Sequence, residues 1–398
     1  MMNTLRKCLA LCGCGLLLSA SIYAQSWEKI HAKAILVDTH NDVLSSATMK
    51  GMDISQHLDG KTHSDLPRFR QGGVDVQIFS IFCYERFGKD TAFRFANIEI
   101  DSLYAIAARN PDQMAVVRTP AGLKKALKQK KMAAMIGVEG GHMIEDKLPY
   151  LDSLYNRGAR YLTLTWNNST SWASSAKDES RDSVLAPQKG LNAFGKQVVQ
   201  RMNQLGMMVD LSHVGEQTFW DAIHTSTKPV IVSHSCVYAL CPVFRNLKDE
   251  QIKAVGQNGG VIHVNFYSGF LDSTYNKQQK HFTESHRDEV AALEKAGKRF
   301  YEIQDILYSK YPDEVQQMRA PMSLLIDHID YIVRLTGINH VGLGSDFDGI
   351  ESPPRELDGV EDYPLLTKAL LERGYSKKDV RKILGGNFIR VFKANSKK

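Results

Sequence analysis

The stretch VDTHND, residues 37–42, places a histidine and an aspartate two positions apart at the end of an apolar run. Other apolar runs in the chain end in residues of the same kind. These further residues are Glu139 in GVEGGH, His213 in VDLSHV, His234 in VSHS and Asp346 in GLGSDFDG. Barrels of alternating strands and helices carry their chemistry at the carboxyl ends of their strands. The pattern that begins at VDTHND therefore predicts such a barrel, with a polar site at its mouth.

Eight apolar runs of strand-like length support that fold. Most are near-continuous, which is typical of parallel strands buried on both faces. They are residues 34–38, 74–82, 132–138, 160–164, 207–211, 229–233, 260–265 and 340–344. Helical patterns separate them, such as residues 191–205, which end before Gly206, and residues 321–335. We predict an α/β fold, a single-domain (β/α)8 TIM-type barrel, with an open parallel sheet as the weaker alternative.

A long, strongly charged segment, residues 269–319, lies between the seventh and eighth of these runs. Connections in such barrels are usually short. We predict a helical insertion above the mouth that covers the site or serves contacts between subunits. A solvated helical insertion that neither covers the site nor forms subunit contacts is an alternative of at least equal weight. A homodimer is the expected assembly.

The composition is that of a globular protein. The 398 residues are 43% hydrophobic, which is enough for a sizeable core. The formal net charge is +6, and much of the excess stands at the two ends of the chain. There is no basic stripe interleaved with aromatic residues, so the sequence argues against a nucleic-acid partner.

Residues 1–24 are predicted to be a secretory signal peptide. Two basic residues precede a mostly apolar stretch that ends in the small residue Ala24. Cleavage before Gln25 leaves a mature domain of residues 25–398, in which no run is long and apolar enough to span a bilayer. We expect secretion across the inner membrane into the periplasm. A membrane anchor, and a lipid-anchored form through Cys12 in LCGC, are the weaker alternatives.

Three cysteines remain after that cleavage: Cys83, Cys236 and Cys241. An odd number in an exported chain leaves at least one thiol free or paired between chains. The spacing of Cys236 and Cys241 allows a local disulfide but does not require one.

The side chains at the strand ends have the chemistry of a two-metal site. His40 and Asp42, two apart at a strand end, point to one face and can chelate one ion. Glu139 follows a buried strand in a glycine-rich turn, and one carboxylate can bridge two ions. His213 and His234 follow consecutive strands, and neutral imidazole is a common zinc ligand.

Two further residues have the chemistry to act on a substrate. Asp346 ends the eighth run, where a carboxylate can take a proton from an attacking water and pass it to a leaving amine. Asp348 competes for this role, although turn capping fits it better. Arg245, in CPVFRNLKD, is a forked cation near the mouth that suits a carboxylate.

The motifs DTHND, GVEGGH, YLTLTWN, VDLSHV, SHS followed by RN, GSDFDG and GGNFIRVF occur in this order across nearly the whole mature chain. In these motifs the chain resembles the zinc-dependent membrane (renal) dipeptidase family, binuclear amidohydrolases with a distorted (β/α)8 barrel. The resemblance implies two zinc ions per chain. It implies that His40, Asp42 and Glu139 hold one ion, that Glu139, His213 and His234 hold the other, and that Glu139 bridges them.

The resemblance also implies the roles of the residues that meet the substrate. Arg245 resembles the residue that binds the terminal carboxylate of the substrate. Asp346 resembles the residue that activates the water and protonates the departing amine, so it counts with Glu139 as catalytic and also contacts the substrate.

One position departs from the family pattern. Trp166 stands where the family motif LTLTH has a histidine that steadies the tetrahedral oxyanion. Trp has a single N–H donor and cannot be cationic, and loss of one oxyanion donor lowers turnover by ~10²–10³. We expect Trp166 to form a wall of the substrate pocket, with Asn167, Asn168 or a metal ion in the lost role. An indole turned away to pack under its loop is the alternative. The family's inter-loop disulfide is not expected, because Cys83 has no evident partner.

The sequence therefore predicts an exported zinc dipeptidase that hydrolyses the peptide bond of dipeptides through a metal-bridging hydroxide. By family analogy, dipeptides with a D-residue on the C-terminal side are candidate substrates. One rival is another binuclear amidohydrolase that acts on N-acyl amino acids or lactams. The other is a peptide-binding relative of low activity, because Trp166 replaces the family histidine.

Overall fold

In the part of the chain that the structure describes, nine parallel strands form the centre of the fold, and eight of them close into a barrel. The computed structural model describes residues 27–181 and 189–397, so the predicted signal peptide and its cleavage site lie outside the described residues. The strand order is β2-β1-β9-β8-β7-β6-β5-β4-β3, and pairing of β2 with β4 closes the ring. The strands are β1 Leu36–Asn41, β2 Val74–Ile81, β3 Met114–Val116, β4 Met132–Glu139, β5 Ala159–Thr163, β6 Met208–Asp210, β7 Ile231–Val232, β8 Val261–Val264 and β9 Val341–Leu343. The predicted single-domain (β/α)8 barrel is confirmed, and each of the eight predicted runs overlaps a strand of the barrel.

The sequence analysis missed one strand, β3. It pairs with the first half of β4, with Met114 opposite Met132 and Val116 opposite Ala134. The next strand, β5, pairs with the second half of β4. The strand β3 therefore lies on the same edge of β4 as β5 and does not add a ninth strand to the barrel wall. A run of three residues is too short for a strand pattern to be recognised.

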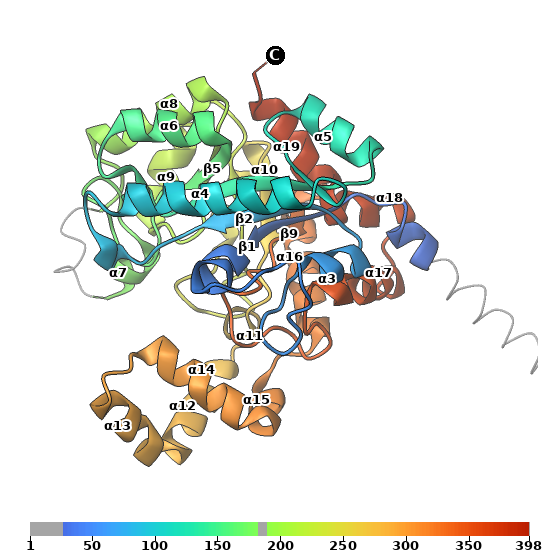
Figure 1. The fold of residues 1–398 in the computed structure, drawn as a ribbon. Helices are drawn as coiled ribbons and strands as arrows, with labels where there is room; N and C mark the ends of the chain where they lie inside the picture. The colour runs from blue at the N-terminus through green and yellow to red at the C-terminus, as the bar shows by residue number, and fades with distance from the viewer. Residues whose placement is uncertain (1–26, 182–188, 398) are drawn as a thin grey trace, which may run out of the picture.

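Helices surround the barrel (Figure 1). They are α2 Val43–Ser46, α3 Leu66–Gln71, α4 Ala92–Arg109, α5 Pro120–Lys128, α6 Leu148–Arg157, α7 Ala176–Ser180, α8 Ala193–Leu205, α9 Glu216–Thr225, α10 Asp249–Gln257, α16 Met322–Thr336, α17 Tyr363–Glu372, α18 Lys377–Arg381 and α19 Asn387–Asn395. Single turns are η1 Thr48–Lys50, η2 Glu85–Phe87, η3 Gly141–Ile144, η4 Val360–Asp362 and η5 Lys382–Gly386. The helix predicted before Gly206 is α8, and Gly206 ends it in the left-handed conformation, with φ 86°.

The last helix closes the amino-terminal end of the barrel. Its Asn387 donates a hydrogen bond to the carbonyl of Val341, at the start of β9, at 2.8 Å. Its Arg390 donates to Gly259, just before β8, at 2.6 Å. Phe388 of α19 belongs to the same buried cluster as barrel-lining side chains such as Val37. With this end filled, only the carboxyl end of the barrel is left for a site.

The predicted helical insertion between β8 and β9 is confirmed. It consists of α11 Ser268–Leu271, α12 Tyr275–Ser285, α13 Arg287–Lys295, α14 Phe300–Lys310 and α15 Pro312–Met318. In Figure 1 the helices α12 to α15 form a lobe that projects from the barrel. The lobe has a core of its own, which includes Phe282 and Leu307. The lobe contacts the loop after β2 through Arg299, whose guanidinium carbon lies 5.8 Å from the ring centre of Tyr84. A part for this lobe in subunit contacts stays a prediction, as does the homodimer.

The three described cysteines are buried and free. The Sγ atom of Cys236 points to the carbonyl of Asn265 at 3.2 Å, and that of Cys241 to the carbonyl of Gly269 at 3.5 Å. The local disulfide that the spacing allows is therefore not formed. Among the described helices, none has both the length and the apolar character needed to cross a bilayer.

Candidate metal centre

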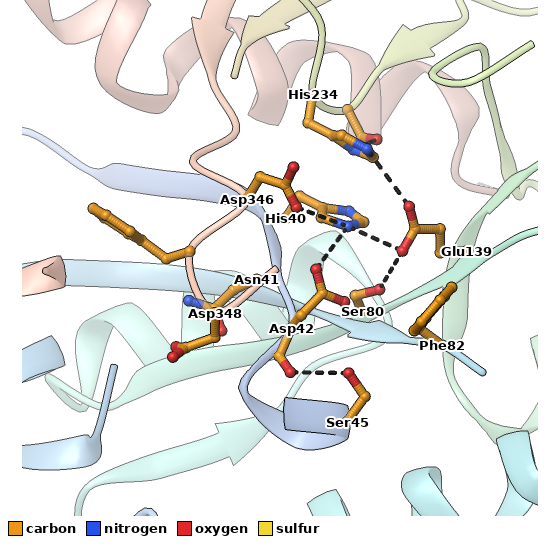
Figure 2. A network of polar contacts seen from close by, with 12 residues as sticks. His40, Asn41, Asp42, Ser45, Ser80, Phe82, Glu139, His234, Asp346 and Asp348 are labelled. Atoms are coloured by element: carbon orange, nitrogen blue, oxygen red, sulfur yellow. Dashed lines mark hydrogen bonds and ion pairs between the residues drawn. The ribbon is translucent and has the colours of Figure 1, made fainter. Parts of the chain in front are cut away.

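Five side chains from the ends of four strands meet in one buried cluster, and Figure 2 labels four of them, His40, Asp42, Glu139 and His234. His40 Nε2 lies 3.5 Å from Asp42 Oδ2 and 3.4 Å from Glu139 Oε2. The other oxygen of this glutamate, Oε1, lies 3.0 Å from His213 Nε2 and 3.6 Å from His234 Nε2. Glu139 thus stands between two groups of ligand-type atoms and turns one oxygen to each.

The grouping of these atoms differs in part from the one that the family resemblance implies. Potential ligand atoms within 4.8 Å of one another form two sets, His40 with Glu139 and His234, and His40 with Asp42 and Asp346. His40 belongs to both because its ring lies against that of His234, with 3.8 Å between ring centres. His213 is in neither set, but its Nε2 approaches His234 Nε2 to 2.9 Å.

Unusual backbone aims several of these side chains into the cluster. The register between β1 and β2 shifts between Asp38 and Asn41, and such a bulge re-aims the side chains that it contains, here that of His40. His213 and Asp346 have positive φ angles of 65° and 63°. A residue other than glycine pays of order 1–3 kcal/mol for such a conformation. The fold holds this strain at two residues of the cluster.

Each of the three imidazoles has an oxygen partner at Nδ1, on the side away from the cluster. The partners are the Tyr161 hydroxyl for His40 at 2.8 Å, the Asn167 Oδ1 for His213 at 3.1 Å and the Ser233 Oγ for His234 at 2.8 Å. An amide oxygen can only accept, while Tyr161 gives its hydrogen to the carbonyl of Thr39 and Ser233 gives its own to Asp210. Each Nδ1 is therefore the donor in its pair.

It follows that Nε2 of each ring carries a lone pair whenever that ring is neutral, and the three Nε2 atoms converge. Two such lone pairs, on His213 and His234, face each other at 2.9 Å. His40 Nε2 is buried without a hydrogen-bond partner among the described residues. Lone pairs this close repel unless a cation lies between them. Neutral imidazoles with Nδ1 held by a second layer, together with carboxylates, fit a divalent metal such as zinc.

The surroundings of the cluster keep two of the imidazoles neutral and favour positive charge on the third. Burial lowers the pKa of His213 to about 4, and burial together with His40 lowers the pKa of His234 well below its usual value. Burial acts to lower the pKa of His40 as well, but Tyr161, Glu139 and Asp42 raise it well above its usual value. His40 is therefore the imidazole that takes up positive charge beside the carboxylates, while His213 and His234 stay neutral.

Arg245 lies beside the cluster with a donor unused. It is 5% exposed, and its two terminal nitrogens donate to Ser235 Oγ at 3.0 Å and to the carbonyl of His234 at 3.1 Å. Its Nε is buried without a hydrogen-bond partner among the described residues. Among the described residues, no carboxylate oxygen lies within 4.0 Å of its guanidinium nitrogens, although Asp346 and Glu139 partly offset the lowering of its pKa by burial. A buried cation without an ion-pair partner is suited to receive an anion.

The two aspartates of GSDFDG, Asp346 and Asp348, have different surroundings. Asp346 Oδ1 lies 3.9 Å from His40 Nε2, while its Oδ2 accepts a hydrogen bond from Asn265 Nδ2 at 2.8 Å. Burial, with Asp42 and Glu139 nearby, raises the pKa of Asp346 well above its usual value against the opposing effect of His40. Asp348 instead accepts from the backbone N–H of His63 at 2.7 Å and lies apart from Glu139 in Figure 2.

Trp166 is half-buried at the edge of the cluster. Its ring centre lies 6.4 Å from that of His213. On its other side it packs against Phe82 and Tyr84, at 5.0 and 5.7 Å between ring centres. The neighbouring Asn167 is engaged with His213 through its Oδ1. The indole thus stands beside the imidazoles and does not turn away from them.

The side chains that form hydrogen bonds to the residues of the cluster, directly or through a serine, were not predicted from the sequence. They are Tyr161, Asn265, Ser233, Asp210 and Ser80, whose hydroxyl reaches Glu139 Oε2 at 3.3 Å. The available signal was a polar residue inside an apolar strand, as in MMVDLS and PVIVS. A polar side chain in a buried strand must find a partner.

A family model described as membrane dipeptidase (peptidase family M19) matches residues 24–398. The chain belongs to this family. It is therefore a metallo-dipeptidase, an enzyme that hydrolyses peptide bonds and depends on metal. The resemblance seen in the sequence motifs is confirmed.

Solved structures with the same fold cover almost the whole chain. The probable dipeptidase PvdM from Pseudomonas aeruginosa is 23% identical, with a TM-score of 0.78 over 94% of this chain and 98% of that one. A metallopeptidase from Rhodobacter sphaeroides, bound to a phosphinate mimic of the dipeptide L-Ala-D-Ala, is 23% identical, with a TM-score of 0.72 over 92% and 100%. At this level of identity the likeness bears on the fold.

Replacement of Glu139 by Gln is expected to weaken metal binding throughout the cluster. The reason is that Oε2 of this carboxylate faces His40, while Oε1 faces His213. Elemental analysis of the purified parent should give about two divalent ions per chain, by the two-metal logic of such sites. The Glu139→Gln protein should hold clearly fewer than the parent. The control is Glu179→Gln, which changes a carboxylate bonded to Ser174 instead. Full occupancy in Glu139→Gln would remove this residue from a bridging position.

Proposed function

We propose that this protein is an exported dipeptidase with a two-zinc centre that cleaves dipeptides bearing a free C-terminal carboxylate. The observation that carries the proposal is the buried Arg245, with an unpaired Nε–H, whose terminal nitrogen donates to the carbonyl of His234, one of three imidazoles with convergent Nε2 atoms. A carboxylate bound at this guanidinium would leave the peptide bond of a dipeptide at the cluster. A longer peptide has no carboxylate at that distance.

Five residues would hold the metal ions. We assign one ion to His40, Asp42 and Glu139, and the other to Glu139, His213 and His234. The close approach of these atoms, 3.0 to 3.6 Å around Glu139, supports this assignment. Divalent ions there would polarise the peptide carbonyl and lower the pKa of the attacking water.

Asp346 is assigned the proton transfer. It would take the proton from the attacking water and return it to the leaving amine, as general base and then general acid. Two features support this role. Asn265 holds one carboxylate oxygen, so that the other, at 3.9 Å from His40 Nε2, stays turned to the cluster. The raised pKa of Asp346 is also in the direction that favours uptake of a proton by this carboxylate.

Trp166 is assigned the wall of the pocket. The ring lies between His213 and the aromatic pair Phe82 and Tyr84, which supports a fixed apolar surface beside the cluster. Asn167 is committed to His213, so we assign the stabilisation of the oxyanion to a metal ion. Dipeptides with a D-residue on the C-terminal side are the first substrates to test, since a relative binds a mimic of L-Ala-D-Ala.

Export rests on the amino-terminal sequence. The basic residues and apolar stretch within residues 1–24 support a cleaved signal peptide and a periplasmic enzyme. The free, buried state of all three described cysteines is consistent with a mature protein that does not depend on disulfides.

The carboxylate clamp predicts a sharp preference among substrates. Free dipeptides such as L-Ala-D-Ala should be hydrolysed, while their C-terminal amides should be poor substrates. Arg245→Ala should raise KM for the free dipeptide by about 10²-fold, since a charged hydrogen bond contributes about 1.5–3 kcal/mol. An HPLC assay of product amino acids measures both. The panel should include N-acetyl amino acids, because preferential turnover of these would favour the amidohydrolase alternative. Equal rates on acid and amide would exclude the clamp.

Replacement of Asp346 by Asn is expected to abolish turnover while metal stays bound. Asn keeps the shape and the contact to Asn265 but cannot take a proton. Turnover and metal content should be measured on the same preparation, with Asp348→Asn as the matched control that keeps most of its activity. Substantial kcat in a metal-replete Asp346→Asn protein would assign the proton transfer to another group.

Replacement of Trp166 by His is expected to change which dipeptides are preferred more than it changes the best rate. The smaller ring opens the space next to Phe82 and Tyr84, so bulkier substrate side chains should gain relative to alanine. Ratios of kcat/KM over a series of X-D-Ala dipeptides measure the change. An unchanged profile would mean that the indole packs under its loop without touching the substrate.

A further inference from the structure

One of the three imidazoles of the cluster is linked to a buried carboxylate that has no part in the proposed chemistry. Asp210 ends β6 and is fully buried, as are its neighbours Ser212 and Ser233. It lies behind His234, with Ser233 between them. This arrangement is not repeated at the other two imidazoles.

The contacts of Asp210 define the direction of each hydrogen bond. Its Oδ2 accepts from Ser233 Oγ at 2.6 Å and from Thr163 Oγ1 at 2.6 Å. Its Oδ1 accepts from the backbone N–H groups of Ser233 at 2.8 Å and Ser212 at 3.2 Å. All four partners are donors, which is the environment of an acceptor-only carboxylate.

Ser233 therefore has its single hydrogen committed. At 2.6 Å from a carboxylate oxygen the hydroxyl must donate, since two oxygen lone pairs at that distance repel. The same oxygen lies 2.8 Å from His234 Nδ1. That contact can only be a hydrogen bond from Nδ1–H to Ser233, so a continuous chain runs from His234 through Ser233 to Asp210.

The other two imidazoles end on neutral groups. His40 Nδ1 donates to the phenol of Tyr161, which passes its own hydrogen to the carbonyl of Thr39. His213 Nδ1 donates to the amide oxygen of Asn167. A carboxylate behind a ligating imidazole increases its basicity and fixes its tautomer more strongly than a neutral partner does.

We propose that Asp210, acting through the Ser233 hydroxyl, is a positioning residue that makes His234 the strongest imidazole donor of the centre and tightens the metal position that His234 shares. The proposal rests on the two-metal centre of the proposed function. The relay separates the affinities of the two metal positions, because only the ion at His234 lies at the end of a chain from an anion. The ion at His40 and Asp42 depends on this chain only through the bridging Glu139.

Removal of the Ser233 hydroxyl tests the relay directly. Zn²⁺ affinity is measured by competition with a chromophoric chelator, on full-length parent, Ser233→Ala, Ser233→Thr and Tyr161→Phe. Ser233→Ala should weaken one of the two binding steps by about 10–100-fold, the range found when outer partners of metal ligands are removed. Ser233→Thr, which keeps a hydroxyl, should recover most of that affinity. Tyr161→Phe, which removes a neutral partner of His40, should cost less.

The metal-free proteins provide the control for a purely structural effect. Ser233→Ala keeps the backbone hydrogen bond from Ser233 to Asp210, and Tyr161→Phe also removes a buried hydroxyl, so the melting temperatures of the two variants without zinc should fall by similar amounts. An unchanged zinc affinity in Ser233→Ala, or a loss no greater than in Tyr161→Phe, would overturn the relay and leave the dipeptidase assignment standing. A parent protein that binds no zinc would overturn both.

Discussion

The carboxylate of Glu139 is the constraint on which the rest of the site depends. It is 4% exposed at the end of β4, with one oxygen 3.4 Å from His40 Nε2 and the other 3.0 Å from His213 Nε2. Burial of a carboxylate costs several kcal/mol unless opposite charge compensates it. Without metal, a proton on His40, whose pKa is raised well above its usual value, supplies part of that charge, and bound cations would supply it in the metal-loaded enzyme. The bulge in β1 and the positive φ angles of His213 and Asp346 aim the neighbouring side chains at this one position.

The two ends of the barrel differ: the amino-terminal end is closed, and the carboxyl end carries the site. The amino-terminal end is closed by α19, whose polar side chains bind the starts of β8 and β9. The site residues come from the carboxyl ends of the strands, where Arg245 contacts His234 and Trp166 lies beside His213. The two differ in what they offer: a cation with a free donor, and a ring fixed between His213 and the aromatic pair after β2. This difference favours a substrate with an anionic end, bounded elsewhere by an apolar wall.

Much of this could be predicted from the sequence. Apolar runs located all eight barrel strands, because burial on both faces makes such strands conspicuous, and five of these runs are followed by a histidine or carboxylate of the site. Closure of a parallel barrel then brings the strand ends together, which is why His40, Asp42, Glu139, His213 and His234 could be expected to meet. Asp346 and Arg245 followed from the same geometry and from the family motifs.

The remainder depends on contacts that no local pattern encodes. The pairing of β3 with half of β4 is decided by tertiary packing. The lobe of α12 to α15 was recognised as an insertion, but its separate core and its contact from Arg299 to Tyr84 required the structure. The link from Asp210 to His234 joins residues from two strands through a serine, and the sequence shows only two polar residues in apolar runs.

X-ray anomalous scattering, recorded above and below the zinc absorption edge on crystals of the zinc-loaded protein, tests the central claim most directly. The account predicts two zinc peaks, one beside His40 and Asp42 and one beside His213 and His234, with the carboxylate of Glu139 between them. A single peak, or peaks that lie beyond bonding distance of Glu139, would contradict it.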